Sequence, residues 1–165
     1  MMPERILTAR LRLRPVAASD EEVVVAVLND IAVTGWLAVV PHPYAPEDFR
    51  WFLSTVARPG ETFALEDDAG LAGIMGAGRE LGYWLAPRAH GRGYATEAAR
   101  AILAEQLAVD PSPVASGYFE GNLRSARVLE KLGFAEVGRF PKYCRAMGRE
   151  RPHVEMRLEP AAFCG

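Results

Sequence analysis

The stretch Leu81-Gly-Tyr-Trp-Leu-Ala-Pro-Arg-Ala-His-Gly-Arg-Gly-Tyr-Ala-Thr-Glu97 carries most of the information about the fold. Its first part, residues 80–86, alternates in the way that is typical of a strand buried on both faces. A helix is predicted over residues 94–108. The loop that joins the two contains Gly91 and Gly93, so the segment reads as strand, glycine loop and helix.

This order of elements is chemically suited to an anion. The first N–H groups of a helix have no partner within the helix and carry partial positive charge, and glycines let the backbone approach a bulky group. Arg88 and Arg92 add formal charge. A pyrophosphate would be held well in such a loop, although an ordinary strand-to-helix turn explains two glycines equally well. The spacing fits neither a dinucleotide fingerprint nor a P-loop, because no third glycine and no Gly-Lys-Ser/Thr follows.

Outside this stretch, the sequence predicts an α+β fold in which short turns join antiparallel strands. Strands are expected at residues 8–16, 62–65, 71–75, 114–119, 134–137 and 154–158, and helices at 19–28, 46–57 and 122–132. Ser19 and Glu22 form a predicted capping box, Pro46 suits a first helical turn, and Gly133 suits the position after a helix. No linker or repeat is visible, so we expect one domain over residues 1–165.

The composition excludes several classes of protein. Half of the 165 residues are hydrophobic, 24% are charged and the formal net charge is -2, so the chain is neither disordered nor a basic nucleic-acid binder. The start, MMPERILTAR, lacks the apolar segment of a signal peptide, and no apolar run is long enough to span a bilayer. Cys144 and Cys164 do not form a disulfide framework. We therefore expect a cytoplasmic protein that binds neither nucleic acid nor membrane.

Several separated motifs resemble the GNAT superfamily of N-acetyltransferases. Arg88-x-x-Gly91-x-Gly93-x-Ala95 resembles its acetyl-CoA signature, and GYWLAP..HGRGYATEA is similar to the branch of the ribosomal-protein alanine N-acetyltransferases (RimJ/RimL-like). The opening Thr8-Ala-Arg-Leu-Arg-Leu-Arg-Pro15, the loop 41–44 and Gly121-Asn-Leu-Arg-Ser-Ala-Arg-Val-Leu-Glu-Lys-Leu-Gly-Phe134 are similar to the same branch. The resemblance covers most of the chain. It implies helices on both faces of a mixed, mostly antiparallel sheet that splays between residues 80–86 and 114–119.

The resemblance also implies where acetyl-CoA would bind. Main-chain groups of Trp84, Leu85 and Ala86 would pair with the pantetheine arm, as an added strand does. The pyrophosphate would be held by amides of His90, Gly91, Arg92, Gly93, Tyr94 and Ala95, with charge from Arg88. Asn122 would contact the CoA arm, and Arg127, with Arg124 and Lys131, could reach the 3′-phosphate. The asparagine also fits a plain N-cap, and the three basic residues also fit a solvated helix face.

Acetyl transfer needs a neutral amine, a stabilised oxyanion and a proton for the departing thiolate. A backbone N–H near Leu85 is the expected oxyanion donor. Glu80 is the candidate base and Glu120 a second one, and each is also explained as a solvated residue beside a turn. Ser125 matches a serine that the branch uses as a proposed proton donor, or it bonds only locally near its helix start.

No cluster of residues indicates an acyl-enzyme or a metal. His42, His90 and His153 are scattered along the chain and form neither a metal set nor a triad. We therefore expect no metal, and direct transfer through a ternary complex.

The acceptor is the least specified part. An α-amine has an ordinary pKa of about 8 against about 10.4 for lysine, so roughly a tenth of it is neutral at pH 7. The stretch 36–44, with Trp36 and Tyr44 as predicted substrate contacts, is apolar and has no acidic cluster. This favours the α-amine of a protein or peptide, or a small-molecule amine, over polyamines and aminoglycosides.

Two further points stay open. A non-catalytic acyl-CoA-binding or sensory GNAT-like domain would keep the same loop and helix, so it is the alternative to an enzyme. Family members are often dimers, which leaves a homodimer open for this chain.

Overall fold

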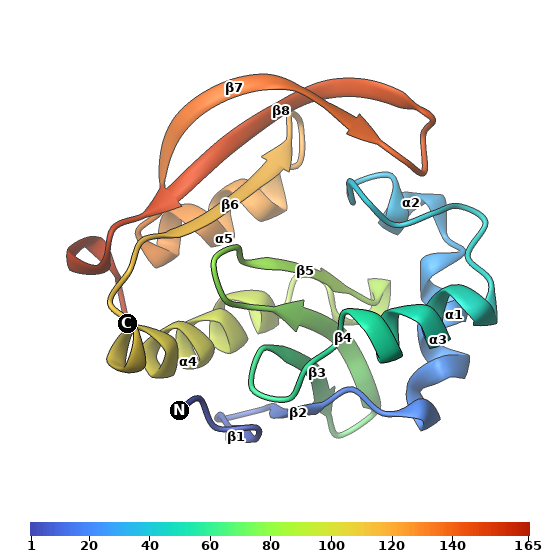
Figure 1. Cartoon of the computed structure of the whole chain (residues 1–165), viewed down its shortest axis with the longest axis horizontal. Coiled ribbons are helices and arrows are strands. Elements are labelled where there is room, and N and C mark those ends of the chain that lie inside the picture. Colours follow the sequence, from blue (N-terminus) through green and yellow to red (C-terminus); the bar gives the residue numbers. More distant parts are fainter.

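The strands form two antiparallel sheets, and the computed structural model describes all residues from 1 to 165 (Figure 1). The first sheet has the order β1 (Ile6–Leu7), β2 (Arg12–Pro15), β3 (Thr62–Asp67), β4 (Gly70–Gly76) and β5 (Gly82–Leu85). The second has the order β6 (Val114–Phe119), β8 (Arg149–Leu158) and β7 (Ala135–Cys144). The predicted α+β class with mostly antiparallel pairing is confirmed.

The two sheets meet at one parallel bridge and then separate. Glu80 and Ala115 are the bridge partners. The N–H of Leu81 donates to the carbonyl of Ala115, and the N–H of Ala115 donates to that of Arg79, each at 2.8 Å. The hydroxyl of the buried Ser116 donates to the carbonyl of Leu81 at 2.7 Å. Beyond this closed end β5 and β6 diverge, so the predicted splay between these strands is confirmed.

Helices cover both faces of the first sheet (Figure 1). On one face lies α4 (Tyr94–Val109), with α5 (Leu123–Leu132) packed beside it and against β6, and on the other lie α1 (Glu21–Leu28), the short α2 (Ile31–Thr34) and α3 (Pro46–Thr55). Strand β3 shows the division, because Phe63 and Leu65 belong to the core under α4 and α5 whereas Ala64 belongs to the core under α1 and α3. Three single-turn helices complete the chain: η1 (Ala18–Asp20), η2 (Pro87–Ala89) and η3 (Pro160–Ala162).

Local sequence explains most helix ends. Pro46 occupies the first turn of α3, and the side chain of Asn122 caps α5 by accepting from the N–H of Ser125. Gly133 ends α5 with a φ of 102°, a left-handed conformation that favours glycine. These three predictions are confirmed. The capping box of Ser19 and Glu22 is wrong, because the carboxylate of Asp20 instead accepts the N–H of Ala17 at 2.9 Å and α1 begins at Glu21.

The C-terminal hairpin is much longer than the sequence predicts. Strands β7 and β8 run for 10 residues each, whereas only residues 134–137 and 154–158 were expected, because charged side chains conceal the alternation between them. The far end of the hairpin lies against the segment after α2 (Figure 1). There the N–H of Arg145 donates to the carbonyl of Ala38 at 2.9 Å, and the Arg151 guanidinium donates to the carbonyl of Gly35.

Candidate active site

Backbone groups that neither sheet uses line the gap between β5 and β6. The N–H of Ala86 donates to the carbonyl of Ala72 in β4 at 2.8 Å, and the same register pairs Trp84 with β4. Alternate residues of a strand direct their N–H and C=O groups to opposite edges, so those of Tyr83 and Leu85 point toward β6. Of the three residues expected to pair with pantetheine, Leu85 therefore faces the gap, while Trp84 and Ala86 pair with β4.

Side chains alternate between two faces of the same gap. Glu80 and Ala115 are bridge partners, so they share a face, which also carries Gly82 and Gly117 two residues farther along each strand. A β-carbon at Gly82 would meet no heavy atom within 4 Å, so there is open space above it. We call this side of the two sheets the Gly82 face. The side chain of Tyr83 lies on the opposite face and packs against the core under α4 and α5.

The glycine loop presents unpaired N–H groups at the start of α4. None of the N–H groups of residues 91–96 donates to another group of the chain. Gly91 and Gly93 have φ values of 74° and 78°, which favour glycine. A β-carbon at Gly91 would meet nothing within 4 Å. An open row of amide donors at a helix N-terminus fits a pyrophosphate.

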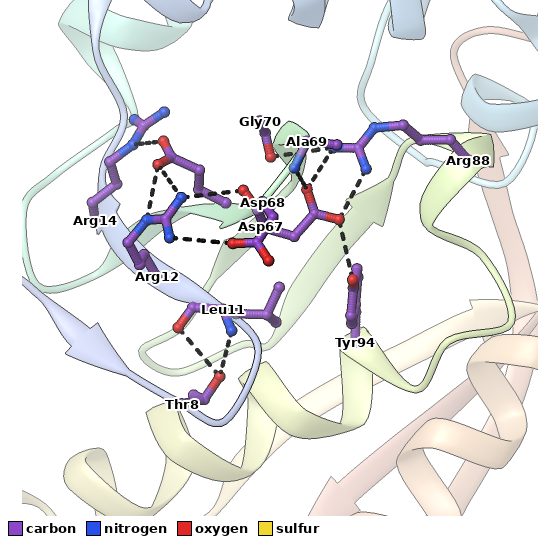
Figure 2. Close-up of polar contacts among 11 residues, drawn as sticks. Thr8, Leu11, Arg12, Arg14, Asp67, Asp68, Ala69, Gly70, Arg88 and Tyr94 are labelled. Atoms are coloured by element: carbon purple, nitrogen blue, oxygen red, sulfur yellow. Dashed lines mark hydrogen bonds and ion pairs between the residues drawn. The ribbon is translucent and has the colours of Figure 1, made fainter.

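One buried carboxylate holds both ends of this loop (Figure 2). Asp67, the last residue of β3, accepts two hydrogen bonds from Arg88 at 2.9 and 3.0 Å and one from the Tyr94 hydroxyl at 3.1 Å. Its side chain is only 5% exposed. The Arg88 guanidinium, acting against burial, lowers the pKa of Asp67 to about 2. Arg88 also donates to the carbonyls of Gly70 and Leu71, so its guanidinium positions the loop, and its contact with phosphate stays a prediction.

The segment between β1 and β2 holds the middle of the loop. Arg10 donates to the carbonyl of Arg92 at 2.7 Å and to the carboxylate of Glu97 at 3.1 Å. Its guanidinium also lies 4.9 Å from the centre of the Tyr94 ring. Thr8 donates to the other oxygen of Glu97 at 2.9 Å. Arg92 itself is exposed and its side chain has no protein partner, so it remains available to an anion.

His90 connects the two sides of the gap at its open end. The Arg124 guanidinium, on α5, donates to Nδ1 of His90 at 3.0 Å, so Nε2 carries the proton and donates to the carbonyl of Leu85 at 2.9 Å. The carbonyl of Leu85 therefore has a partner, whereas its N–H does not. Of the two groups, the N–H is the one that remains free for an oxyanion.

A hydroxyl cluster crosses the gap on the face of α5. The Tyr83 hydroxyl donates to Oγ of Ser125 at 3.1 Å, and the side-chain amide of Asn122 donates to the same oxygen at 3.3 Å. Burial raises the pKa of Tyr83 above its ordinary value of 10, and the bond to Ser125 opposes this effect. Tyr83 was not singled out from the sequence. The signal for it was its alternation with Leu81 and Leu85 along the strand that leads into the glycine loop.

The remaining predicted residues fall into exposed and buried groups. Glu80 is exposed at the closed end of the gap, and Arg127 is exposed on α5, and neither has a protein partner. Trp36 is 38% exposed, and its ring lies beneath the guanidinium of Arg151 at 5.1 Å. Tyr44 is only 7% exposed and belongs to the core under α1 and α3, where burial, with the charge of Asp48, raises its pKa to about 12. Its side chain is thus a core group, contrary to the expected substrate contact.

The comparison with protein families agrees with this arrangement. A family model described as the acetyltransferase (GNAT) domain matches residues 10–135, which include the loop, both strands of the gap and α5. The chain belongs to the GNAT acetyltransferase family. It is therefore an acetyltransferase that uses acetyl-CoA as the acetyl donor. No curated protein sequence matches it.

Solved structures give the same fold at low sequence identity. An acetyltransferase (GNAT family) from Bacillus anthracis is 24% identical with a TM-score of 0.79, over 95% of this chain and 99% of that one. Mycobacterium smegmatis RimJ in complex with CoA-disulfide is 24% identical with a TM-score of 0.78, over 96% and 90%. Spermidine N-acetyltransferase from Vibrio cholerae, in complex with CoA and spermine, is 17% identical with a TM-score of 0.77, over 93% and 98%. These likenesses show the fold and leave the acceptor to be inferred from the site.

No helix is both long and apolar enough to cross a membrane. No group of three or more His, Cys, Asp or Glu side chains is placed to hold a metal ion.

Proposed function

We propose that this acetyltransferase transfers the acetyl group to the α-amine of a peptide or protein, or to a small primary amine. The transfer would be direct, within a ternary complex, and the whole chain would form one catalytic domain. The observation that carries the proposal is the gap between β5 and β6. The free N–H of Leu85 points into it, the hydroxyl cluster of Tyr83 and Ser125 lies on one face, and open space lies above Gly82 on the other.

Residues at the open end of the gap fit acetyl-CoA. Amides of residues 91–96 would hold the pyrophosphate, and Arg92 would add charge. Arg127 and Arg124 on α5 are exposed on the same side and would meet the 3′-phosphate. When bound, acetyl-CoA supplies an acetyl group activated as a thioester. The N–H of Leu85 would stabilise the charge that develops on the carbonyl oxygen, an effect typically worth about 3 kcal/mol.

The hydroxyl cluster would return a proton to the thiolate. Oγ of Ser125 accepts hydrogen bonds from both Tyr83 and Asn122, so its own hydrogen is free to donate into the gap. A serine hydroxyl is a weak acid when it acts alone. Tyr83 would replace the proton that Ser125 gives up, so the pair would act as a relay.

Charge near the Gly82 face favours an acceptor with one amine over a polyamine. Lys142 and Arg151 are register partners on that face, and Arg145 and Arg149 lie at the end of the same hairpin. These cations outnumber the carboxylates of Glu80 and Glu155 on that face and would repel an acceptor that carries several positive charges. The apolar ring of Trp36 lies beside them and would contact the acceptor.

A thiol-release assay with acetyl-CoA tests the proposal. The panel contains dipeptides, free amino acids, polyamines and aminoglycosides, and calorimetric binding of CoA is measured alongside. We expect CoA binding, with release for amines of the first two groups and little release for the last two. CoA binding without release from any amine would favour the sensory alternative, and no CoA binding would overturn the site.

We also propose a homodimer in the cytoplasm. Both cysteines are free thiols, as is usual in a reducing compartment. Strand β7 is an edge strand that exposes Val137, Phe140 and Tyr143, and an apolar edge strand is suited to a second chain. Light scattering on the purified chain should give twice the monomer mass of 18.1 kDa. A monomer at that concentration would contradict this part of the proposal.

A further inference from the structure

His153 and Glu155 lie on the Gly82 face, beside the gap. In the pairing of β6 with β8, Glu155 is the partner of Gly117 and His153 is the partner of Phe119. Partner residues direct their side chains to the same face of a sheet. The proposed acceptor would approach from this face. The two residues are distant in sequence from β5 and β6, and the register of β8 against β6 brings them beside the gap.

The ring of His153 extends from β8 across β6 toward the gap. A β-carbon at Gly117 would lie 2.4 Å from Cε1 and 3.2 Å from Nε2 of His153, so the imidazole occupies the space that a side chain would fill. Phe119 meets the ring edge to face at 5.1 Å. A glycine inside a strand weakens it and often marks a close approach. Here the group that approaches the glycine closely is the imidazole of His153.

The hydrogen bonds of His153 fix which nitrogen is basic. Nδ1 lies 2.8 Å from the carboxylate of Glu155, which can only accept, so Nδ1 carries the hydrogen and Nε2 the lone pair. Nε2 has no partner in the chain, and no fully buried side-chain nitrogen or oxygen in the chain lacks one. Nε2 therefore reaches solvent even though His153 as a whole is only 6% exposed.

We propose that Nε2 of His153, held by Glu155, accepts the proton of the acceptor ammonium, directly or through one water. This step rests on the proposed amine acetylation. It assigns the base to a residue that forms no sequence motif, in place of Glu80. A carboxylate ordinarily has a pKa near 4 and an imidazole one near 6.5, so the imidazole lies closer to working pH.

Burial keeps His153 neutral, whereas two nearby carboxylates favour its protonated form. Burial lowers its pKa below 6.5, and Lys142 on β7 acts in the same direction. Glu155 on its own strand and Glu80 at the closed end of the gap oppose this change. On β8, Arg151 is a further charged neighbour, and its guanidinium lies against the rings of Trp36 and Phe119. The imidazole is thus free to take up a proton at pH 7, and Glu155 then faces the imidazolium.

The protons balance over the whole reaction. The ammonium gives one proton to Nε2, and the nitrogen lone pair then forms the C–N bond as the C–S bond breaks. Of the two protons left on nitrogen, one stays in the amide and one is lost to solvent, while the thiolate takes one from the Ser125–Tyr83 relay, which solvent recharges. The proton on His153 also returns to solvent, so each turnover releases one proton in total.

The test compares kcat/KM of His153→Gln with the unchanged protein as pH rises, using the dipeptide that gives the most thiol release. At pH 7 we expect a loss of about 100-fold, within the usual range for general bases. Above the acceptor's own pKa of about 8 the amine is neutral without help, so the loss should shrink to a few-fold near pH 10. Glu155→Gln, whose side chain is partly exposed, should show the same pattern with a smaller loss. Arg157→Gln, two residues farther along the same face, is the matched control and should change little.

The outcomes separate this inference from the proposed function. A loss that is equal at every pH, or no loss, overturns the role of His153 while leaving the acetyltransferase proposal intact. Failure of the unchanged protein to release thiol with any amine overturns the proposed function itself. Unchanged CoA affinity by calorimetry shows that the folded site survives in each variant.

Discussion

The two faces of the gap between β5 and β6 are built in different ways. On the side that we call the cofactor face, the glycine loop before α4 supplies the amide donors, and it is held at both ends by Asp67 and in the middle by Arg10. On the Gly82 face, the proposed functional groups come from the segment after α2, the closed end of the gap and the C-terminal hairpin. The first face depends on local backbone conformation, whereas the second depends on strand register.

We therefore expect mutations on the two faces to affect different steps. Changes near the loop should alter CoA affinity and leave the chemistry of the bound state largely intact. Changes on the Gly82 face should alter turnover or acceptor use and leave CoA affinity intact. Substitutions on either face test this division, and we expect the largest change in CoA affinity from a substitution in the glycine loop.

Gly91→Glu should abolish CoA binding, with a loss of at least about 100-fold, or about 3 kcal/mol. The carboxylate would enter the open space above the loop and repel the pyrophosphate. Because φ is 74° there, Gly91→Asn is the control, since asparagine tolerates this conformation without adding charge. Calorimetry should show a far smaller loss for the control, and equal losses would mean that strain rather than charge explains the result.

Ser125→Ala and Tyr83→Phe should each lower kcat by about 100-fold with little change in CoA affinity, because each breaks the proposed proton relay. The double variant should be hardly worse than either single variant, since the residues act as one unit. Steady-state kinetics of all three variants measure this coupling. Multiplied losses would show that the two hydroxyls act independently.

Asp67→Asn should raise the Kd for CoA by roughly tenfold, because the charged bonds that position Arg88 and Tyr94 are weakened. The control is Asp68→Asn, whose side chain is fully exposed and reaches Arg12 only at 3.9 Å. Calorimetry with both variants measures the difference. Equal affinities would show that the loop holds its shape without Asp67.

The same carboxylate predicts a pH effect on stability. Its pKa falls from 3.8 to about 2 on folding, so its contribution of about 2 kcal/mol is present above pH 4 and is lost as pH drops toward 2. Denaturant unfolding from pH 5 to pH 2 should show that Asp67→Asn is less stable at the upper end and lacks this part of the decline. A parallel decline in both proteins would contradict the assignment.

Arg127→Ala should cause the smallest effect, about threefold in CoA affinity, because an exposed charge is worth little. Dephospho-CoA, which lacks the 3′-phosphate, provides the comparison. The variant should bind CoA and dephospho-CoA with nearly equal affinity if Arg127 meets that phosphate. A loss of the same size for both ligands would place Arg127 elsewhere.

How much could be predicted from the sequence follows the same division. Elements whose conformation depends on neighbouring residues could be predicted from the sequence. These are the glycine loop, α4, α5 with its Asn122 cap, and the strand 114–119. The pairing of Arg88 with Asp67 and the burial of Tyr44 could not be read from the sequence, because their partners come from distant segments. The full length of β7 and β8 could not be predicted, because charged side chains interrupt the alternation of polar and apolar residues along both strands. The position of His153 over Gly117 follows from a pairing that no local pattern reveals.

The most direct test of the two-face division is calorimetric titration of acetyl-CoA into Gly91→Glu and His153→Gln side by side. The division predicts that the first variant loses binding and that the second binds as tightly as the unchanged protein. Retained binding in folded Gly91→Glu, or an equal loss in both variants, would contradict it.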